Sequence, residues 1–248
     1  MAVVRISPRV VGRVMAVVVV VLVAASSAGQ FSTYYLGRDH LLGFVERFSL
    51  DAEANIPSWY SSVVLLFCAV LLGLIAVARR TARDTWWPHW AALSVIFVYV
   101  SLDEAGRLHE LAIEPLREHL GASGLFYWAW VIPAMFVIPV LAVAYLRFLI
   151  ALPRPTRRLF VLAATLFLTG ALGLEMLGGP WVETHGLHSP VYVVFWTMEE
   201  TLEMSAVAIF TYALLRYMET HAGAVQLVFG ASRDKAADVF EDRLSRSA

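Results

Sequence analysis

Long apolar runs separated by short polar connections make up most of this chain. Six of the runs approach the length of about 20 residues that carries a helix across a bilayer. They occupy residues 14–28, 59–78, 87–102, 125–149, 159–177 and 191–217. This pattern predicts an all-α fold, a polytopic membrane helix bundle with about six transmembrane helices over residues 1–218. A polar tail, residues 219–248, follows, and its stretch DKAADVFEDRL is compatible with a short helix.

Basic residues cluster at alternate connections between the runs. Most of the 19 Lys and Arg residues lie before the first run, after the second, around residues 147–158, or at the end of the last run and in the tail. Because cytoplasmic loops carry an excess of Lys and Arg, we expect both termini in the cytoplasm. The pattern is typical of a multi-pass protein of a bacterial-type inner (plasma) membrane.

Two segments near the N-terminus carry further patterns. The first run has the Arg-bearing start and the small residues up to Ala28 that are typical of a signal peptide, and we expect it to be an uncleaved anchor. The following external loop alternates apolar and charged residues between Leu41 and Asp51. This predicts a short amphipathic helix on the membrane surface.

Composition supports the membrane class and excludes several others. The chain is 59% hydrophobic and 16% charged, and its net charge of −1 gives no argument for binding nucleic acid. The mean hydropathy is +0.68. Its single cysteine, Cys68, excludes an intramolecular disulfide and a Cys-based metal site. No haem is expected, because no pair of histidines lies deep in two runs, and no glycine-rich loop indicates a nucleotide.

Seven acidic residues interrupt the apolar pattern. A carboxylate costs several kcal/mol to hold in hydrocarbon, so each one needs a proton, a partner or a metal ion. The seven are Asp103, Glu104, Glu110, Glu175, Glu199, Glu200 and Glu203. This set is too large to be incidental, and it predicts where the chemistry takes place.

The expected topology brings these acidic residues to the external half of the bundle. The third run leads outward, so Asp103 lies about 24 Å along it. The sixth run leads inward, which places Glu199 and Glu203 about 12–18 Å below the outer surface. Glu175, His185 and His188 belong to the outer end as well. We therefore expect the third and sixth helices to face each other around one site.

Helical spacing refines this picture. Asp103, Arg107 and Glu110 share one stripe, on which Arg107 pairs with Asp103, whereas His109 points elsewhere unless Gly106 breaks the helix. Glu203 lies one turn from both Glu199 and Glu200, so these three carboxylates must share protons or bind a cation. Gly170 and Gly173 share a face and predict a close helix approach beside Glu175.

The leading hypothesis is a metal-dependent membrane enzyme, hydrolytic, that acts on a lipid or lipid-linked substrate among the membrane lipids. A divalent Zn, Mn or Fe ion suits oxygen and nitrogen ligands, and its bound water would be the nucleophile. The candidate metal ligands are Asp103, His109, Glu110, Glu199 and Glu203. The candidate catalytic residues are Asp103, Glu110, Glu200 and Arg107.

Two alternatives use the same residues. One is proton- or cation-coupled transport of an ionic substrate, favoured by a weak symmetry between SLDE (101–104) and TMEE (197–200) in runs of opposite direction. The other is a membrane assembly or accessory subunit without chemistry, in which Arg107 and the carboxylates fix the packing. One arginine cannot neutralise seven acids, which counts against the second alternative.

Five polar residues loosely resemble the metal site of the ceramidase-like superfamily of membrane hydrolases. Ser101, Asp103, His109, His185 and His188 correspond to the Ser, Asp and three His that surround zinc in that family. The resemblance implies a zinc hydrolase in a helical bundle. The sequence departs from the family in the spacing of its late histidines, in its number of runs and in the EExxE cluster.

Overall fold

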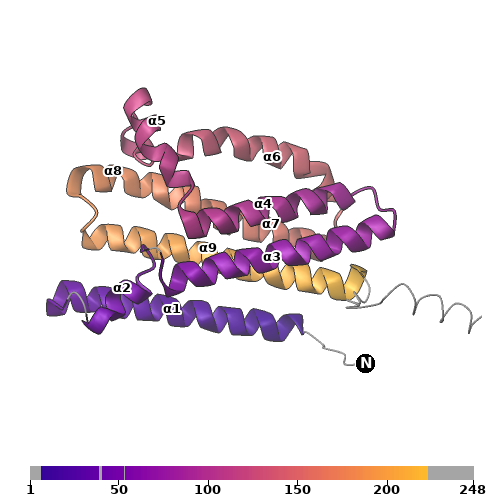
Figure 1. Cartoon of the computed structure of the whole chain (residues 1–248), viewed down its shortest axis with the longest axis horizontal. Helices are drawn as coiled ribbons and strands as arrows, with labels where there is room; N and C mark the ends of the chain where they lie inside the picture. The colour runs from indigo at the N-terminus through magenta and orange to yellow at the C-terminus, as the bar shows by residue number, and fades with distance from the viewer. Residues whose placement is uncertain (1–6, 39–40, 53, 223–248) are drawn as a thin grey trace, which may run out of the picture.

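A computed structural model describes residues 7–38, 41–52 and 54–222 of the chain. Long helices run side by side along the longest axis of the molecule and alternate in direction (Figure 1). The described residues contain no β-strand, and the all-α prediction is confirmed. The helices are α1 (Pro8–Leu36), α2 (Phe44–Phe48), α3 (Ile56–Thr81), α4 (Trp87–Gly106), α5 (Ile113–Leu120), α6 (Val131–Ala151), α7 (Arg154–Leu168), α8 (Glu175–His185) and α9 (Pro190–Tyr217).

Short segments join these helices. Three are 3-10 turns, η1 (Leu41–Gly43), η2 (His109–Ala112) and η3 (Gly124–Phe126), and two are π-turns, η4 (Thr169–Leu174) and η5 (Met218–Ala222). Because η4 joins α7 to α8 without a break, residues 154–185 form one long helical rod. The predicted tail begins in η5, and its remaining part, which includes DKAADVFEDRL, lies outside the described residues.

Local sequence signals set the helix ends. Helix α3 starts with a reciprocal cap, in which the Asn55 side chain accepts a hydrogen bond from Ser58 N and Asn55 N donates to Ser58 Oγ, both at 3.1 Å. Such a capping box gives acceptors to two backbone N–H groups at the helix start that have no partner within the helix. Gly37 follows the last residue of α1 and caps it with a left-handed φ of 63°, which suits a residue without Cβ.

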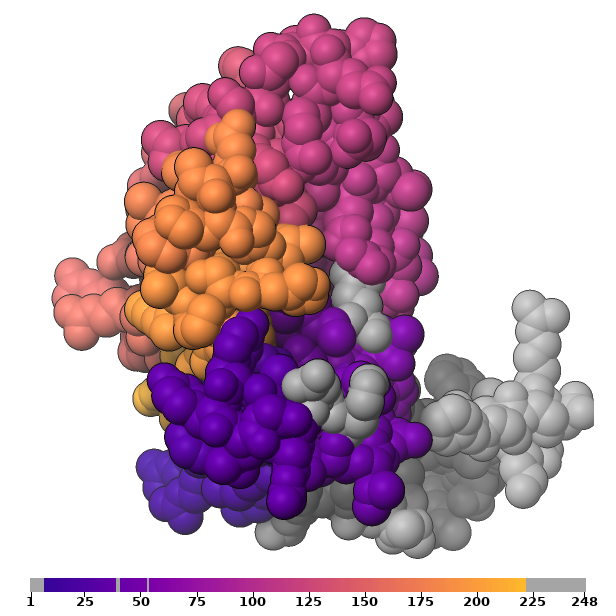
Figure 2. Space-filling model, turned by 90° about the vertical axis from the view of Figure 1, so that its left-hand side faces the viewer, coloured from indigo at the N-terminus to yellow at the C-terminus, as the bar shows by residue number. Residues whose placement is uncertain are grey.

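The bundle has two chemically different ends. The basic end holds the α3–α4 connection, with Arg79, Arg80 and Arg83, and the α6–α7 connection. The acidic end holds α2, α5 and the α8–α9 connection, and Figure 2 looks onto this end. The six predicted runs coincide largely with α1, α3, α4, α6, the rod of residues 154–185 and α9, although α6 begins at Val131 and not at residue 125.

Helix α9 is the centre of the bundle. It packs against α1, α3 and α7, and α3 also packs along α4. Toward the basic end the core is closed by large side chains from several helices, which are 0–1% exposed. They are Leu72, Ile75, Trp90, Phe148 and Leu214.

Among the described residues, four helical segments are long and apolar enough to cross a membrane, as is typical of a membrane protein. They are α1, α3, α6 and the rod of residues 154–185. Helices α4 and α9 are not among the four, and they contain the acidic residues at positions 103–104 and 199–203. The amphipathic segment predicted between Leu41 and Asp51 forms the short helix α2, which packs against α1.

Candidate functional site

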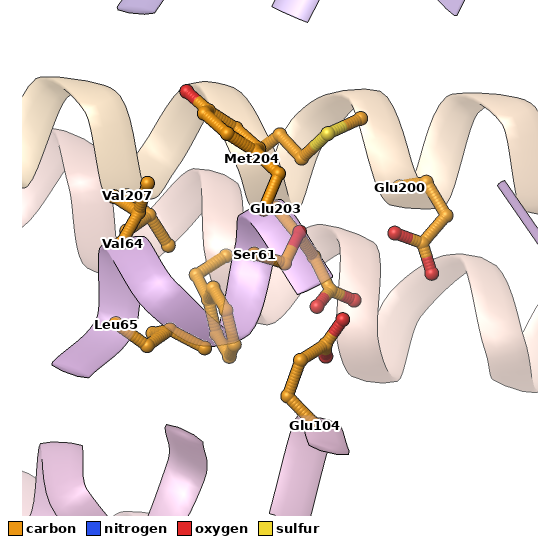
Figure 3. Close-up of a pocket in the computed structure, with 10 residues that line it drawn as sticks. Ser61, Val64, Leu65, Glu104, Glu200, Glu203, Met204 and Val207 are labelled. Atoms are coloured by element: carbon orange, nitrogen blue, oxygen red, sulfur yellow. The ribbon is translucent and has the colours of Figure 1, made fainter. Parts of the chain in front are cut away.

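Three glutamates from two helices line one small cavity inside the bundle. Glu104 comes from α4, and Glu200 and Glu203 come from α9. Figure 3 shows Glu104 and Glu203 extending toward each other, with Glu200 nearby on α9. The cavity has a volume of about 10 Å³, which is room for about one water molecule. The structure thus brings carboxylates of the third and sixth predicted runs together.

The rest of the cavity wall is mostly apolar. Tyr60, Ser61, Val64, Leu65, Phe167, Met204 and Val207 complete it. None of these described wall residues is basic. The hydroxyl oxygen of Tyr60 is buried and has no hydrogen-bond partner among the described residues. Because buried hydroxyls normally have one, this wall favours a polar occupant such as water.

Gly170, in the π-turn η4, lets the rod of residues 154–185 lie close to α9 at this site. A Cβ atom on Gly170 would lie 2.9 Å from the backbone oxygen of Glu199 and 3.0 Å from Cγ of Glu203. Only a glycine fits there without a shift of one helix. Gly173 is different, because a Cβ atom on it would meet only Thr169 and Leu168 of its own helix, at 3.8 Å and more. The predicted notch is therefore present at Gly170 and absent at Gly173.

Asp103 and His109 form a pair at the end of α4. His109 N donates to Asp103 Oδ1 at 2.7 Å, and His109 Nδ1 lies 2.9 Å from Asp103 Oδ2. His109 was expected to point away from Asp103 unless Gly106 broke the helix, and this break is present, because α4 ends at Gly106. Arg107 caps it in a left-handed conformation with φ of 53°, which turns the chain back toward Asp103.

The same break changes the partners of Arg107. Its guanidinium forms an ion pair with Glu110, while both carboxylate oxygens of Asp103 contact His109. The predicted single stripe along a straight helix is therefore wrong. Arg107 and Glu110 are both partly exposed at the acidic end, so their pair is a surface contact of small energetic value.

The pKa of His109 lies above its usual value. Burial acts to lower it, but the hydrogen bond with Asp103 and the negative charges of Asp103, Glu175 and Glu110 outweigh the burial. Protonated His109 is therefore stabilised by carboxylates from η2, α4 and α8. The pair therefore favours the protonated form of His109 more than water does.

Glu175 connects this pair to the carboxylates of α9. Its Oε1 accepts a hydrogen bond from Trp130 Nε1 at 2.9 Å, and the Trp130 ring lies 4.9 Å from the His109 ring. The charge of Glu175 acts on both Glu199 and Glu203. The acidic residues of α4, α8 and α9 consequently form one electrostatically continuous group.

The candidate metal ligands are only partly brought together. Asp103 contacts His109, Glu110 pairs with Arg107, and Glu199 and Glu203 lie on α9. Among the described residues, no group of three or more His, Cys, Asp or Glu is arranged to hold a metal ion. The chemistry of the donors fits Zn, Mn or Fe, but their arrangement does not form such a centre.

The residues that resemble the ceramidase-like site have different partners. Only Asp103 and His109 of that set are in direct contact. Ser101 exchanges hydrogen bonds with Ser62 of α3, and its Oγ donates to Ser62 O at 2.8 Å. His185 stacks on Trp181 with ring centroids 4.0 Å apart.

Glu104 belongs to the site although the sequence did not single it out as a metal ligand or catalytic residue. It stands next to Asp103, but successive helical residues point about 100° apart, and the structure directs Glu104 into the cavity. Its signal was present in the sequence, as one of the seven acids. Asp51 was also missed as a site residue, and its charge acts on Glu199. No sequence signal linked this loop residue to α9.

Comparison with known proteins identifies a family. Residues 14–217 match the family described as a domain of unknown function (DUF8692). The chain belongs to this family. The match extends from α1 to the end of α9, so it includes every acidic residue of the site. No curated protein matches the chain, and no solved structure matches it.

Proposed function

We propose that this protein is a proton-binding membrane protein whose Glu104, Glu200 and Glu203 take up and release protons as part of proton-coupled transport. The observation that carries the proposal is the position of Glu104 and Glu203, which face each other across a small, buried cavity whose wall is mostly apolar (Figure 3). Two carboxylates that face each other in an apolar surrounding cannot both ionise cheaply. They therefore hold a proton, and its release depends on access to water.

The proposed topology has six crossings of an inner (plasma) membrane, with both termini in the cytoplasm. The four apolar segments account for four of these crossings, and we assign the other two to α4 and α9, because α4 lies along α3 and α9 occupies the centre of the bundle. Arginines gather at the basic end, which the excess of positive charge assigns to the cytoplasm. The carboxylate cavity then lies in the external half of the membrane.

The hypothesis of a metal-dependent hydrolase has less support than proton binding. Such an enzyme needs three protein ligands that converge on one ion and leave a position open for water. The described residues offer the Asp103–His109 pair and no third converging ligand. Proton binding needs only the facing carboxylates that line the cavity.

Infrared spectroscopy of the purified protein tests the proposal directly. A protonated carboxyl group has a carbonyl stretching band that an ionised carboxylate lacks, so we expect this band at neutral pH in the wild type. Glu203→Gln and Glu104→Gln should each reduce it. Glu114→Gln is the matched control, because Glu114 is exposed and pairs with Arg117 on α5. Its band should equal that of the wild type.

Transport itself is tested in liposomes that contain a pH-sensitive dye. Wild-type protein should move protons across the vesicle membrane under a pH gradient and an imposed voltage, and Glu203→Gln should abolish this movement. A wild-type protein whose carboxyl groups are all ionised at neutral pH would overturn the proposal. The proposal would also be wrong if Glu203→Gln left the protonated band unchanged.

A further inference from the structure

A second, larger hollow lies at the acidic end of the bundle, beside the carboxylate cavity. It has a volume of about 440 Å³ and lies between the start of α3 and the end of α4. Its lining residues are Ala54, Asn55, Ile56, Ser58, Trp59, Ser62 and Ala105. A space of this size holds on the order of ten water molecules. We call this hollow the outer groove.

The outer groove and the cavity share walls on two helices. On α3, Ser62 lines the groove and its neighbour Ser61 lines the cavity. On α4, Ala105 lines the groove and its neighbour Glu104 lines the cavity. Ser62 Oγ also donates to Ser101 O at 2.9 Å, and Ser101 Oγ donates to Ser62 O at 2.8 Å, so two serine hydroxyls bridge α3 and α4 beside the groove; we call this pair the Ser62–Ser101 partition.

The opposite side of the cavity is sealed. Beyond Leu65 and Val207, the next turns of α3 and α9 contribute Cys68, Leu72 and Thr211, which are all 0% exposed. Cys68 Sγ and Thr211 Oγ1 lie 3.1 Å apart and hydrogen-bond to each other. The aromatic and aliphatic core described above follows toward the basic end.

We propose that the outer groove is the route by which the carboxylate cavity exchanges protons with water on the external side of the membrane. This inference rests on the proposed function, because it names the access route to the same site. The ligand is water and the protons it carries, which pass the Ser62–Ser101 partition to reach Glu104. The cytoplasmic side is closed in this conformation, so exchange is one-sided.

A cysteine at Ala105 tests the route. The only native cysteine, Cys68, is fully buried and gives a silent background for thiol labelling. Ala105→Cys should react with a membrane-impermeant maleimide in cells or right-side-out vesicles, and at least about tenfold more slowly in inside-out vesicles. The matched control is Leu102→Cys, three residues earlier on α4. Leu102 is 58% exposed but does not line the groove, so it should be covered by lipid and stay unlabelled.

The rate of proton exchange tests the access route separately from proton binding at the carboxylate cavity. Labelled Ala105→Cys protein should show at least about tenfold slower change of the protonated carboxyl band after a pH jump, whereas unlabelled Ala105→Cys should respond as the wild type does. Unchanged kinetics after labelling, or labelling only from the inside, would overturn the route and leave proton binding intact. If the wild-type band is absent, proton binding fails, and the labelling comparison of Ala105→Cys with Leu102→Cys still decides whether the groove holds water.

Discussion

The contact at Gly170 gives the sharpest test of the packing around the site. In Gly170→Ala, the new methyl group would lie 2.9 Å from Glu199 O and 3.0 Å from Glu203 Cγ. Overpacking of this kind costs about 1–3 kcal/mol. Alanine is also the better helix former by about 1 kcal/mol, which acts in the opposite direction. The matched variant Gly173→Ala receives the same gain without the clash, because its Cβ would meet nothing closer than 3.8 Å.

The difference between the two variants isolates the helix contact. It should amount to about 1–3 kcal/mol, with Gly170→Ala the less stable. At about 2–4 °C per kcal/mol for a chain of this size, their melting midpoints should differ by about 2–12 °C. The native Cys68 supplies the assay, since its thiol is 0% exposed and reacts with a fluorogenic maleimide only after unfolding. Equal midpoints would show that the rod of residues 154–185 does not approach α9 as closely as described.

Three further predictions concern individual hydrogen bonds. Asp103→Asn should lower the pKa of His109, because it removes the charge and the charge-assisted hydrogen bond that hold this pKa above its usual value. In the wild type, protonated His109 stabilises the fold at low pH, and this contribution is lost as pH rises through the raised pKa. The stability of the variant should therefore lose this dependence on pH. Ring resonances of His109 in a pH titration measure the change, and an unchanged titration midpoint would refute the assigned pair. Trp130→Phe removes the donor to Glu175 and should cost about 1–3 kcal/mol, with the exposed Trp59→Phe as a neutral control in the same melting assay. Ser26→Ala leaves the buried Leu50 N without its acceptor and should lower the free energy of unfolding by about 1–3 kcal/mol. Ser27→Ala is the control, because Ser27 is exposed on the same helix, and it should leave the stability unchanged. Equal melting midpoints for the two serine variants would contradict the hydrogen bond between α1 and the loop before α3.

The helices were predictable from the sequence because their signals are local. Runs of apolar residues, prolines in the first turns of α1, α3 and α9, and the cap at Asn55 all act within a few positions of the chain. The sequence allowed a helix break at Gly106 but did not require one. Whether a helix ends there depends on Arg107 adopting φ of 53° and on Asp103 capping the next turn, and both require contacts that form after folding.

The orientation of neighbouring acids was the hardest feature to predict. Asp103 and Glu104 are adjacent in sequence, and each is polar enough for a site. Their roles separate because Glu104 lies on the side of α4 that lines the cavity together with α3 and α9, while the chain turns back over Asp103. Sequence spacing gives the angle between two side chains but not the direction of the bundle centre.

The π-turn η4 has a consequence for how the rod of residues 154–185 can vary. A π-turn holds about one residue more than an α-turn, so η4 takes up one extra residue without rotating the helix that follows it. If the same residues adopted regular α-geometry, everything after Leu174 would rotate by about 100° about the helix axis, and Glu175 would swing away from Trp130. The length of this turn therefore sets the rotational phase of α8, and through it the reach of Glu175 toward the carboxylates of α9.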